Sequence, residues 1–256
     1  MKKFKHSGTL GDIIYSLSLV KHFGGGEFFL HLNQVDWIAK HYYNSEPSPY
    51  HKGKMNQKDI DFMRSFFEHQ PYISKFDPLD PSVEITHNLD RFRPLFVHHP
   101  TNYVGVYCQA FGINDPATQD LITSSPWITI QNPVKVPTKP IVINRTSRGW
   151  TPAERNPLWD QWREQGYDLQ SRFVGLPEEY EEFKKFSGWE LDYHPVKDLL
   201  ELAQVIAGAD LFIGNQSVAL SIAQALQVPY KFERRRDLPL ERNESFFKNH
   251  TQGSWF

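Results

Sequence analysis

Two short turns rich in small residues, roughly 200 residues apart, have the composition of anion-binding loops. The first runs from Ser7 to Asp12 and reads SGTLGD, and the second runs from Gly214 to Ser217 and reads GNQS. An amphipathic helix is predicted after each turn, and the first N–H groups of a helix lack intrahelical partners and lie at the positive end of its dipole. Helix starts at the top of a sheet are where α/β proteins bind phosphate groups. One such turn near each end of the chain predicts two Rossmann-like halves that face a shared cleft.

A third polar segment follows the apolar run 141–143, which is predicted to be a buried strand. Its arginines suit a diphosphate, because a planar guanidinium pairs with two oxygens at once. The segment contains Asn144, Arg145, Thr146 and Arg148. The alternative is a solvated loop in which the arginines pair with Glu154 or Glu164.

The next predicted strand, 171–174, is followed by Gly175 and Leu176. These residues also stand at the carboxyl end of a strand, so they could pass close to a nucleobase or a ribose. The alternative is a plain turn that leads into the following helix.

The elements that must position these residues alternate between strand and helix. In the first half, a strand over 3–5, a helix over 12–22 and a strand over 27–32 make a β–α–β unit. In the second half, strands and helices alternate from residue 141 to about residue 230. This alternation indicates a parallel sheet in each half.

The middle of the chain is less regular. Residues 95–97 are the best strand candidate there, and 102–111 have the pattern of a helix. The segment 131–140 is rich in proline and has no helical periodicity, so it is predicted to be the linker. We therefore place the domain boundary between 1–135 and 136–256.

The composition limits the class of protein. The chain has 256 residues, 39% of them hydrophobic, which is enough for a substantial core. The formal net charge of −2, with no basic block longer than 234–236, argues against a surface that coats nucleic acid. A single cysteine, Cys108, fits a reducing compartment. No apolar run approaches the roughly 18 residues that cross a bilayer, and residues 1–5 lead into no signal-peptide core, so a cytoplasmic protein is expected.

Together these segments resemble the ADP-heptose:lipopolysaccharide heptosyltransferases and their shorter relatives, which are GT-B glycosyltransferases. The run from Gly8 to Leu17, GTLGDIIYSL, is similar to the family's opening motif, in which Leu-Gly-Asp precedes an apolar helix. The run from Leu199 to Pro229 is similar to the family's donor-site block. The chain departs from the family pattern at Gln216, where the family usually has Asp, and at Val218, where it has Gly.

The resemblance implies an α/β, GT-B-like fold of two Rossmann-like halves whose parallel sheets face a central cleft. It implies an inverting, metal-independent transfer of a sugar from a nucleotide-diphosphate sugar to an acceptor hydroxyl, with no cofactor. The donor is open among ADP-, UDP- and GDP-sugars. The acceptor is open among a glycan, a protein and a modified nucleic-acid base.

The resemblance also implies roles for single residues. Asp12 would be the general base that takes the acceptor proton, although an aspartate at a helix start is also a preferred cap, and one residue can serve both roles. The second half would hold the nucleotide sugar through Asn144, Arg145, Thr146, Arg148, Gly175, Leu176, Gly214, Asn215, Gln216 and Ser217. The first half would meet the acceptor through Gly8, Thr9, Gly11, His98 and His99.

Two clusters invite other interpretations. The adjacent His98 and His99 have no partner at a metal-ligand spacing, so no metal site is expected, and contact with the acceptor is the better hypothesis. Trp159 and Trp162 share a predicted helix face and are expected in the core rather than as a sugar-stacking platform.

Other functions remain as alternatives. A GT-B relative that binds a nucleotide or a sugar without transferring it would fit Gln216, but the retained Asp12 argues against it. A non-hydrolysing nucleotide-sugar epimerase would also have two halves, but its acid–base cluster is not apparent. A dinucleotide-dependent dehydrogenase is disfavoured, because no G-x-G-x-x-G motif follows the first strand.

Overall fold

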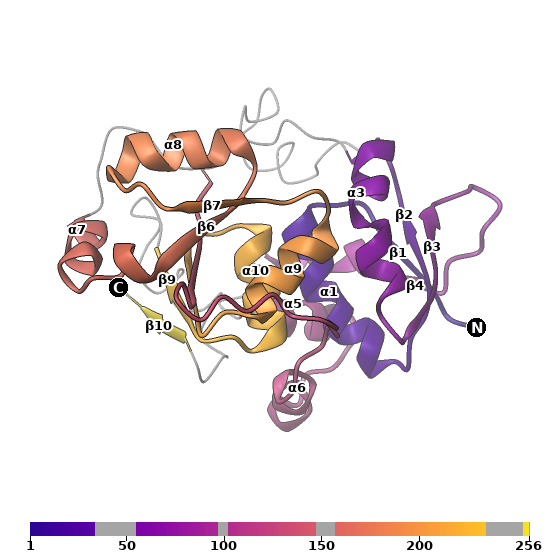
Figure 1. Ribbon diagram of the computed structural model, residues 1–256. Coiled ribbons are helices and arrows are strands. Elements are labelled where there is room, and N and C mark those ends of the chain that lie inside the picture. Colours follow the sequence, from indigo (N-terminus) through magenta and orange to yellow (C-terminus); the bar gives the residue numbers. More distant parts are fainter. Residues whose placement is uncertain (34–54, 97–101, 147–156, 234–252, 256) are drawn as a thin grey trace, which may run out of the picture. The chain divides into compact units, whose positions relative to one another are not determined.

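The computed structural model describes residues 1–33, 55–96, 102–146, 157–233 and 253–255 (Figure 1). These residues form two compact units, which we describe separately. The described residues up to Thr129 belong to unit 1, and those from Ile130 onward belong to unit 2.

Unit 1 contains a four-stranded sheet in the order β3-β2-β1-β4, in which every pairing between described strands is parallel. Its strands are β1 (Lys3–His6), β2 (Gly26–Leu30), β3 (Ile73–Pro78) and β4 (His87–Asn88). Its helices are α1 (Leu10–His22), α3 (Gln57–Glu68), the 3-10 turn η1 (Leu89–Phe92), α4 (Arg93–Phe96), α5 (Tyr103–Ala110) and α6 (Pro116–Thr123).

Unit 2 contains a six-stranded sheet in the order β10-β9-β8-β5-β6-β7, again with only parallel pairings between described strands. Its strands are β5 (Ile141–Asn144), β6 (Ser171–Gly175), β7 (Asp192–Pro195), β8 (Leu211–Gly214), β9 (Tyr230–Phe232) and β10 (Gly253–Trp255). Its helices are α7 (Pro157–Glu164), the 3-10 turn η2 (Asp168–Gln170), α8 (Pro177–Ser187), α9 (Leu199–Ala207) and α10 (Val218–Leu226).

Two separate parallel sheets with helices between their strands confirm the predicted α/β class. Two local predictions were wrong. Residues 95 and 96 belong to helix α4 and not to a strand, because the chain turns directly from η1 into that helix. Helix α1 starts at Leu10 rather than at Asp12, so Asp12 is the third residue of the helix and Thr9 occupies the N-cap position.

One face of the unit 2 sheet carries an aromatic core. Alternate residues of a strand point to opposite faces, and Ile141, Ile143, Phe173 and Ile213 of three neighbouring strands point to the same one. They pack against Trp159 and Trp162 of α7, Phe183 of α8, and Trp189. Since Trp159 and Trp162 are 0% and 2% exposed, the expectation that both tryptophans are core residues is confirmed.

The division between the units has a clear local cause. The indole N–H of Trp127 donates to the Ile14 carbonyl over 3.0 Å, and the amide of Thr129 donates to the Gln70 side chain over 2.8 Å. These two hydrogen bonds attach residues 127–129 to the rest of unit 1. Val134 donates to Gln204 of α9 over 2.9 Å and accepts from Arg172 over 2.7 Å. The segment predicted to be the linker is therefore fastened to unit 2 at Val134.

Among the described helices, none combines the length and the apolar character that a membrane span requires.

Candidate functional site

Asp12 is a buried carboxylate in the first turn of α1. The backbone N–H of Thr9 donates to its Oδ2 over 3.3 Å, which is the contact that an acidic residue makes at the third position of a capped helix. Asp12 also accepts a contact through its main chain, because the Tyr107 hydroxyl donates to its carbonyl over 3.0 Å. The carboxylate is thus held at the helix start by local geometry.

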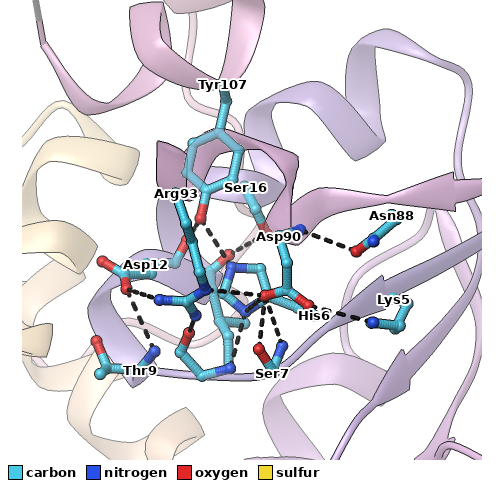
Figure 2. Close-up of polar contacts among 12 residues, drawn as sticks. Lys5, His6, Ser7, Thr9, Asp12, Ser16, Asn88, Asp90, Arg93 and Tyr107 are labelled. Atoms are coloured by element: carbon cyan, nitrogen blue, oxygen red, sulfur yellow. Dashed lines mark hydrogen bonds and ion pairs between the residues drawn. The ribbon is translucent and has the colours of Figure 1, made fainter. Parts of the chain in front are cut away.

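Arg93 of α4 lies between two carboxylates (Figure 2). Its Nε donates to Oδ1 of Asp90 over 3.2 Å, and its Nη1 lies 3.9 Å from Oδ2 of Asp12. Its Nη2 donates to the carbonyl of Gly8 in the turn before α1. The arginine is 8% exposed, so its charge is compensated inside the unit rather than by water.

Asp90 is the second carboxylate of this cluster. Ser7 donates to its Oδ1 through both the backbone N–H, over 3.1 Å, and the hydroxyl, over 2.7 Å. Lys5 lies 3.6 Å from its Oδ2. Burial alone would raise the pKa of Asp90, but the interactions with His6, Arg93, the Ser7 hydroxyl and Lys5 together outweigh it, so the pKa lies below its ordinary value. Asp90 is therefore an ionised anchor for Arg93.

A buried chain of hydrogen bonds through His6 and Tyr107 also supports the turn at Gly8. The Gly8 amide donates to Nδ1 of His6 over 3.0 Å, so the ring proton is on Nε2, which lies 2.7 Å from the Tyr107 hydroxyl. Burial lowers the pKa of His6 to about 3, against a smaller opposite effect of Asp90. Burial also raises the pKa of Tyr107 well above its ordinary value. Both side chains are neutral at physiological pH and act by position.

Our sequence analysis missed this cluster of His6, Asp90, Arg93 and Tyr107. Asp90 and Arg93 are three residues apart, a spacing at which opposite charges on a helical turn form an ion pair, so this part of the cluster had a local sequence signal. No local signal links His6 to Tyr107, which lies 101 positions later in the chain.

The polar residues predicted to bind the nucleotide sugar gather at one edge of the unit 2 sheet. Asn144, Gly175 and Gly214 are the last residues of β5, β6 and β8, which are neighbours in the sheet. Asn144 donates to the Val174 carbonyl over 2.9 Å and accepts from the Ser217 hydroxyl over 3.1 Å. The Asn144 side chain therefore joins the ends of β5 and β6 to the N-cap of α10.

A second asparagine joins the loops that leave these strands. The Thr146 amide donates to the Asn215 side chain over 3.1 Å, and the Asn215 amide group donates back to the Thr146 carbonyl over 2.6 Å. Ser217 is the N-cap of α10 and accepts from the Leu220 amide over 3.4 Å. The Thr146 hydroxyl oxygen is buried and has no hydrogen-bond partner among the described residues.

Close packing explains why glycine is required at two positions of this edge. A Cβ on Gly214 would come within 2.4 Å of the Asn144 carbonyl oxygen, so only glycine lets the two strand ends approach. Gly175 has φ of +146°, and a Cβ there would lie 2.5 Å from Glu179. Burial raises the pKa of Glu179, and the hydrogen bonds from Leu176 and Asn144 only partly offset this. Gly175 and Leu176 thus adjoin a half-buried carboxyl group that the sequence analysis did not single out.

Arg145 has a protein partner at this edge. Its Nε donates to Oε2 of Glu233 over 2.7 Å, both side chains are buried, and its guanidinium lies 3.5 Å from the ring centre of Phe186. The solvated-loop alternative named Glu154 or Glu164 as the partner of the arginines. The structure instead gives Arg145 a buried partner, Glu233, which is 88 positions away in the chain. Arg145 therefore carries a structural ion pair in addition to any role toward a ligand.

The remaining predicted site residues divide into two groups. Gly8, Thr9 and Gly11 lie around the start of α1, beside Asp12, and Gln216 lies between Asn215 and the α10 cap. His98, His99 and Arg148 lie outside the described residues. Within the described part of the chain, no three side chains of the His, Cys, Asp or Glu type are grouped as metal ligands.

Comparison with solved structures finds the same architecture in bacterial sugar transferases. A family 9 glycosyltransferase from Veillonella parvula aligns with 99% of this chain and 84% of its own, at 11% identity and a TM-score of 0.61. The ADP-heptose lipopolysaccharide heptosyltransferase II of E. coli aligns with 100% of this chain and 90% of its own, at 11% identity and a TM-score of 0.51. The fold is that of the heptosyltransferases.

A third structure, E. coli heptosyltransferase WaaC with ADP, aligns with 100% of this chain and 92% of its own, at 12% identity and a TM-score of 0.51. No protein-family model matches the sequence, and no curated protein matches it either. The heptosyltransferase-like fold predicted from the two end motifs is confirmed by these three structures.

Proposed function

We propose that this protein is a glycosyltransferase that moves a sugar from a nucleotide-diphosphate sugar to an acceptor hydroxyl, with inversion and without a metal ion. The observation that carries the proposal is the polar edge of β8, β5 and β6 in unit 2, in a chain whose fold is similar to that of heptosyltransferases over nearly its whole length. A ligand edge at the carboxyl ends of parallel strands is where α/β folds hold nucleotides.

The diphosphate of the donor would lie at the start of α10. Helix α10 has nine residues, and the N–H groups of its first turn and its dipole favour an anion there. The buried Thr146 hydroxyl, with no partner among the described residues, is a donor that a phosphate oxygen would satisfy. Gln216 replaces the family's usual aspartate with a neutral amide, which removes a negative charge from a site for an anion.

Asp12 would take the acceptor proton. As the acceptor oxygen bonds to the anomeric carbon, its proton passes to the Asp12 carboxylate, and the bond from that carbon to the diphosphate breaks with its electron pair. A single displacement of this kind inverts the anomeric centre. The diphosphate leaves with increased negative charge, which the N–H groups of a helix start stabilise.

The second candidate is a protein that binds a nucleotide or a sugar without transferring it. The ion pair between Arg145 and Glu233 favours this reading, because a guanidinium held by a buried carboxylate has less charge to offer a leaving group. The two candidates differ in whether bound donor is cleaved.

A thermal-shift panel tests the donor site first. It would contain ADP, UDP and GDP, their sugar conjugates, and the matching nucleosides. A ligand at 100 times its dissociation constant stabilises the folded protein by about 2.7 kcal/mol, so a diphosphate should raise the melting temperature where its nucleoside does not. Cleavage is then followed as release of nucleoside diphosphate from the conjugate, with water as the acceptor.

Thr146→Val is the matched variant for this panel. It removes the hydroxyl and keeps the shape, so the melting temperature without ligand should not fall. The stabilisation by diphosphate should fall, while any stabilisation by nucleoside should not change. No stabilisation of the wild-type protein by any nucleoside diphosphate or nucleotide sugar would overturn the transferase proposal, and binding of the conjugate without cleavage would favour the second candidate.

A further inference from the structure

We infer that Arg93 is a positioning residue for Asp12, which holds the carboxylate ionised and fixes its direction at the start of α1. The inference rests on the proposed function, in which Asp12 is the base. It is carried by the place of the Arg93 guanidinium, with Asp90 on one side and Asp12 on the other (Figure 2).

The guanidinium is fixed by contacts that leave one edge toward Asp12. Nε is bound to Asp90, Nη2 is bound to the Gly8 carbonyl, and Nη1 lies 3.9 Å from the Asp12 oxygen that also accepts the Thr9 amide. Since the arginine side chain is 9% exposed, water screens this interaction little. Arg93 therefore links the turn, the helix start and the carboxylate in one rigid arrangement.

A merely structural role would be served by the pair of Arg93 and Asp90 alone. Asp90, however, has other partners, because Ser7 donates twice to one of its oxygens and Lys5 lies 3.6 Å from the other. The charge of Arg93 is thus shared between Asp90 and Asp12. An arginine shared in this way favours the ionised form of both carboxylates.

The other titratable groups of the cluster do not replace Arg93. They lie on β1 (Lys5 and His6), in η1 (Asp90) and on α5 (Tyr107). Burial keeps His6 and Tyr107 neutral, and Lys5 is paired with Asp90. Among these described groups, Arg93 is the cation that the structure places within 4.0 Å of Asp12.

A base must be ionised before it takes a proton, and its oxygen must point at the acceptor. When water is the acceptor, its oxygen bonds to the anomeric carbon, its proton passes to Asp12, and the diphosphate leaves with the electron pair of the broken bond. Arg93 takes no proton in this step, and it stays bound to Asp90 before and after. Its contribution is the ionisation and the orientation of Asp12.

The first test measures the titration of Asp12 directly. In protein labelled with 13C at the aspartate carboxyls, the Asp12 signal is identified by its loss in Asp12→Asn. We expect its titration midpoint to move upward by about one pH unit in Arg93→Gln and to return toward the wild-type value in Arg93→Lys. Arg64→Gln, which removes an arginine 3.5 Å from Asp77 in the same unit, is the control and should leave the midpoint unchanged.

The second test measures donor cleavage against pH. Arg93→Gln should lower kcat about tenfold or more with little change in KM for the donor, and its acid limb should move to higher pH. Arg93→Lys should restore the acid limb but only part of kcat, because an ammonium cannot reproduce the fixed fork of the guanidinium. Arg93→Met, which leaves no buried amide unpaired, replaces the glutamine variant if that protein does not fold.

An unchanged Asp12 midpoint in a folded Arg93→Gln or Arg93→Met protein would overturn the inference. If neither variant folds, full kcat in Arg93→Lys would overturn it. Failure of the proposed function gives a different result, in which wild-type protein cleaves no donor although the Asp12 midpoint still depends on Arg93.

Discussion

The backbone amide of Thr9 donates to the carboxylate of Asp12 over 3.3 Å, and the amide of Asn56 donates in the same way to Asp59 over 2.7 Å. Both aspartates are therefore the third residue of a capped helix, α1 and α3. Only Asp12 lies beside a buried arginine among the described contacts of the two residues. Substituting each aspartate in turn therefore separates the effect of capping from any effect on donor cleavage.

We predict that Asp12→Asn lowers the rate of donor cleavage by roughly 10²-fold, since an amide does not accept the proton as a carboxylate does. Stability should fall by roughly 1–2 kcal/mol, because asparagine can still accept the Thr9 amide but loses the interaction of a charge with the helix start and with Arg93, which keeps Asp90 as its partner. Kinetics and thermal unfolding on the same preparation measure both quantities.

Asp59→Asn is the control, because it removes a carboxylate in the same capping position and should leave the rate unchanged. If Asp12→Asn cleaves donor at a near wild-type rate, Asp12 is a structural residue and the base lies elsewhere, with His98 and His99 the first candidates.

The stability of unit 1 should depend on pH through His6. Burial lowers the pKa of His6 from 6.5 to about 3 in the folded protein. Below pH 6.5 the unfolded chain binds a proton that the folded chain refuses, so this contribution is complete above that pH and is lost as the pH falls toward 3. The loss has a limiting slope of about 1.4 kcal/mol per pH unit.

His6→Asn should be less stable than wild type at neutral pH and should show a weaker fall between pH 6.5 and 4. Urea unfolding at a series of pH values checks this. His22→Gln is the control, because His22 is exposed at the end of α1 and its loss should leave the wild-type pH dependence in place. The same slope in His6→Asn and wild type would contradict the prediction.

The ion pair of Arg145 and Glu233 should contribute to folding as a unit. Arg145→Met alone leaves a fully buried carboxylate without its cation, which costs about 3–5 kcal/mol. The double change Arg145→Met with Glu233→Gln should recover a large part of that loss, since the buried charge is gone. A double-mutant cycle of unfolding free energies measures the coupling.

A loss below about 1 kcal/mol in Arg145→Met would mean that the pair is weak, as exposed pairs are. Diphosphate binding by the double variant then decides the ligand role of Arg145. If the double variant is stable and binds as wild type does, Arg145 is structural.

Divalent metal should be dispensable for donor cleavage, because the start of α10 can stabilise the leaving diphosphate. Cleavage in excess EDTA should match cleavage in its absence, at equal ionic strength. Activity that disappears with EDTA and returns with magnesium or manganese would overturn this prediction.

The sequence by itself determined the class of the fold and the position of its two strand-to-helix turns. Alternating apolar strands and amphipathic helices are local patterns, so they indicated parallel sheets before any contact was known. The small-residue turns at Asp12 and Gly214 could be found for the same reason, because a strand-to-helix turn is determined by the types of neighbouring residues. The confirmed heptosyltransferase-like fold follows from those two motifs.

Only the tertiary structure decided which charges meet. Arg93 of α4 lies beside Asp12 of α1, and Arg145 contacts Glu233 across 88 positions, and neither pairing follows from spacing along a helix or a strand. Such partners depend on how the sheets close, because a buried charge takes whichever opposite charge the packing brings near it. The sequence also placed the start of α1 two residues too late. A cap is defined by backbone geometry, and several adjacent residues in this turn can adopt it, so residue types alone do not fix which one is the cap.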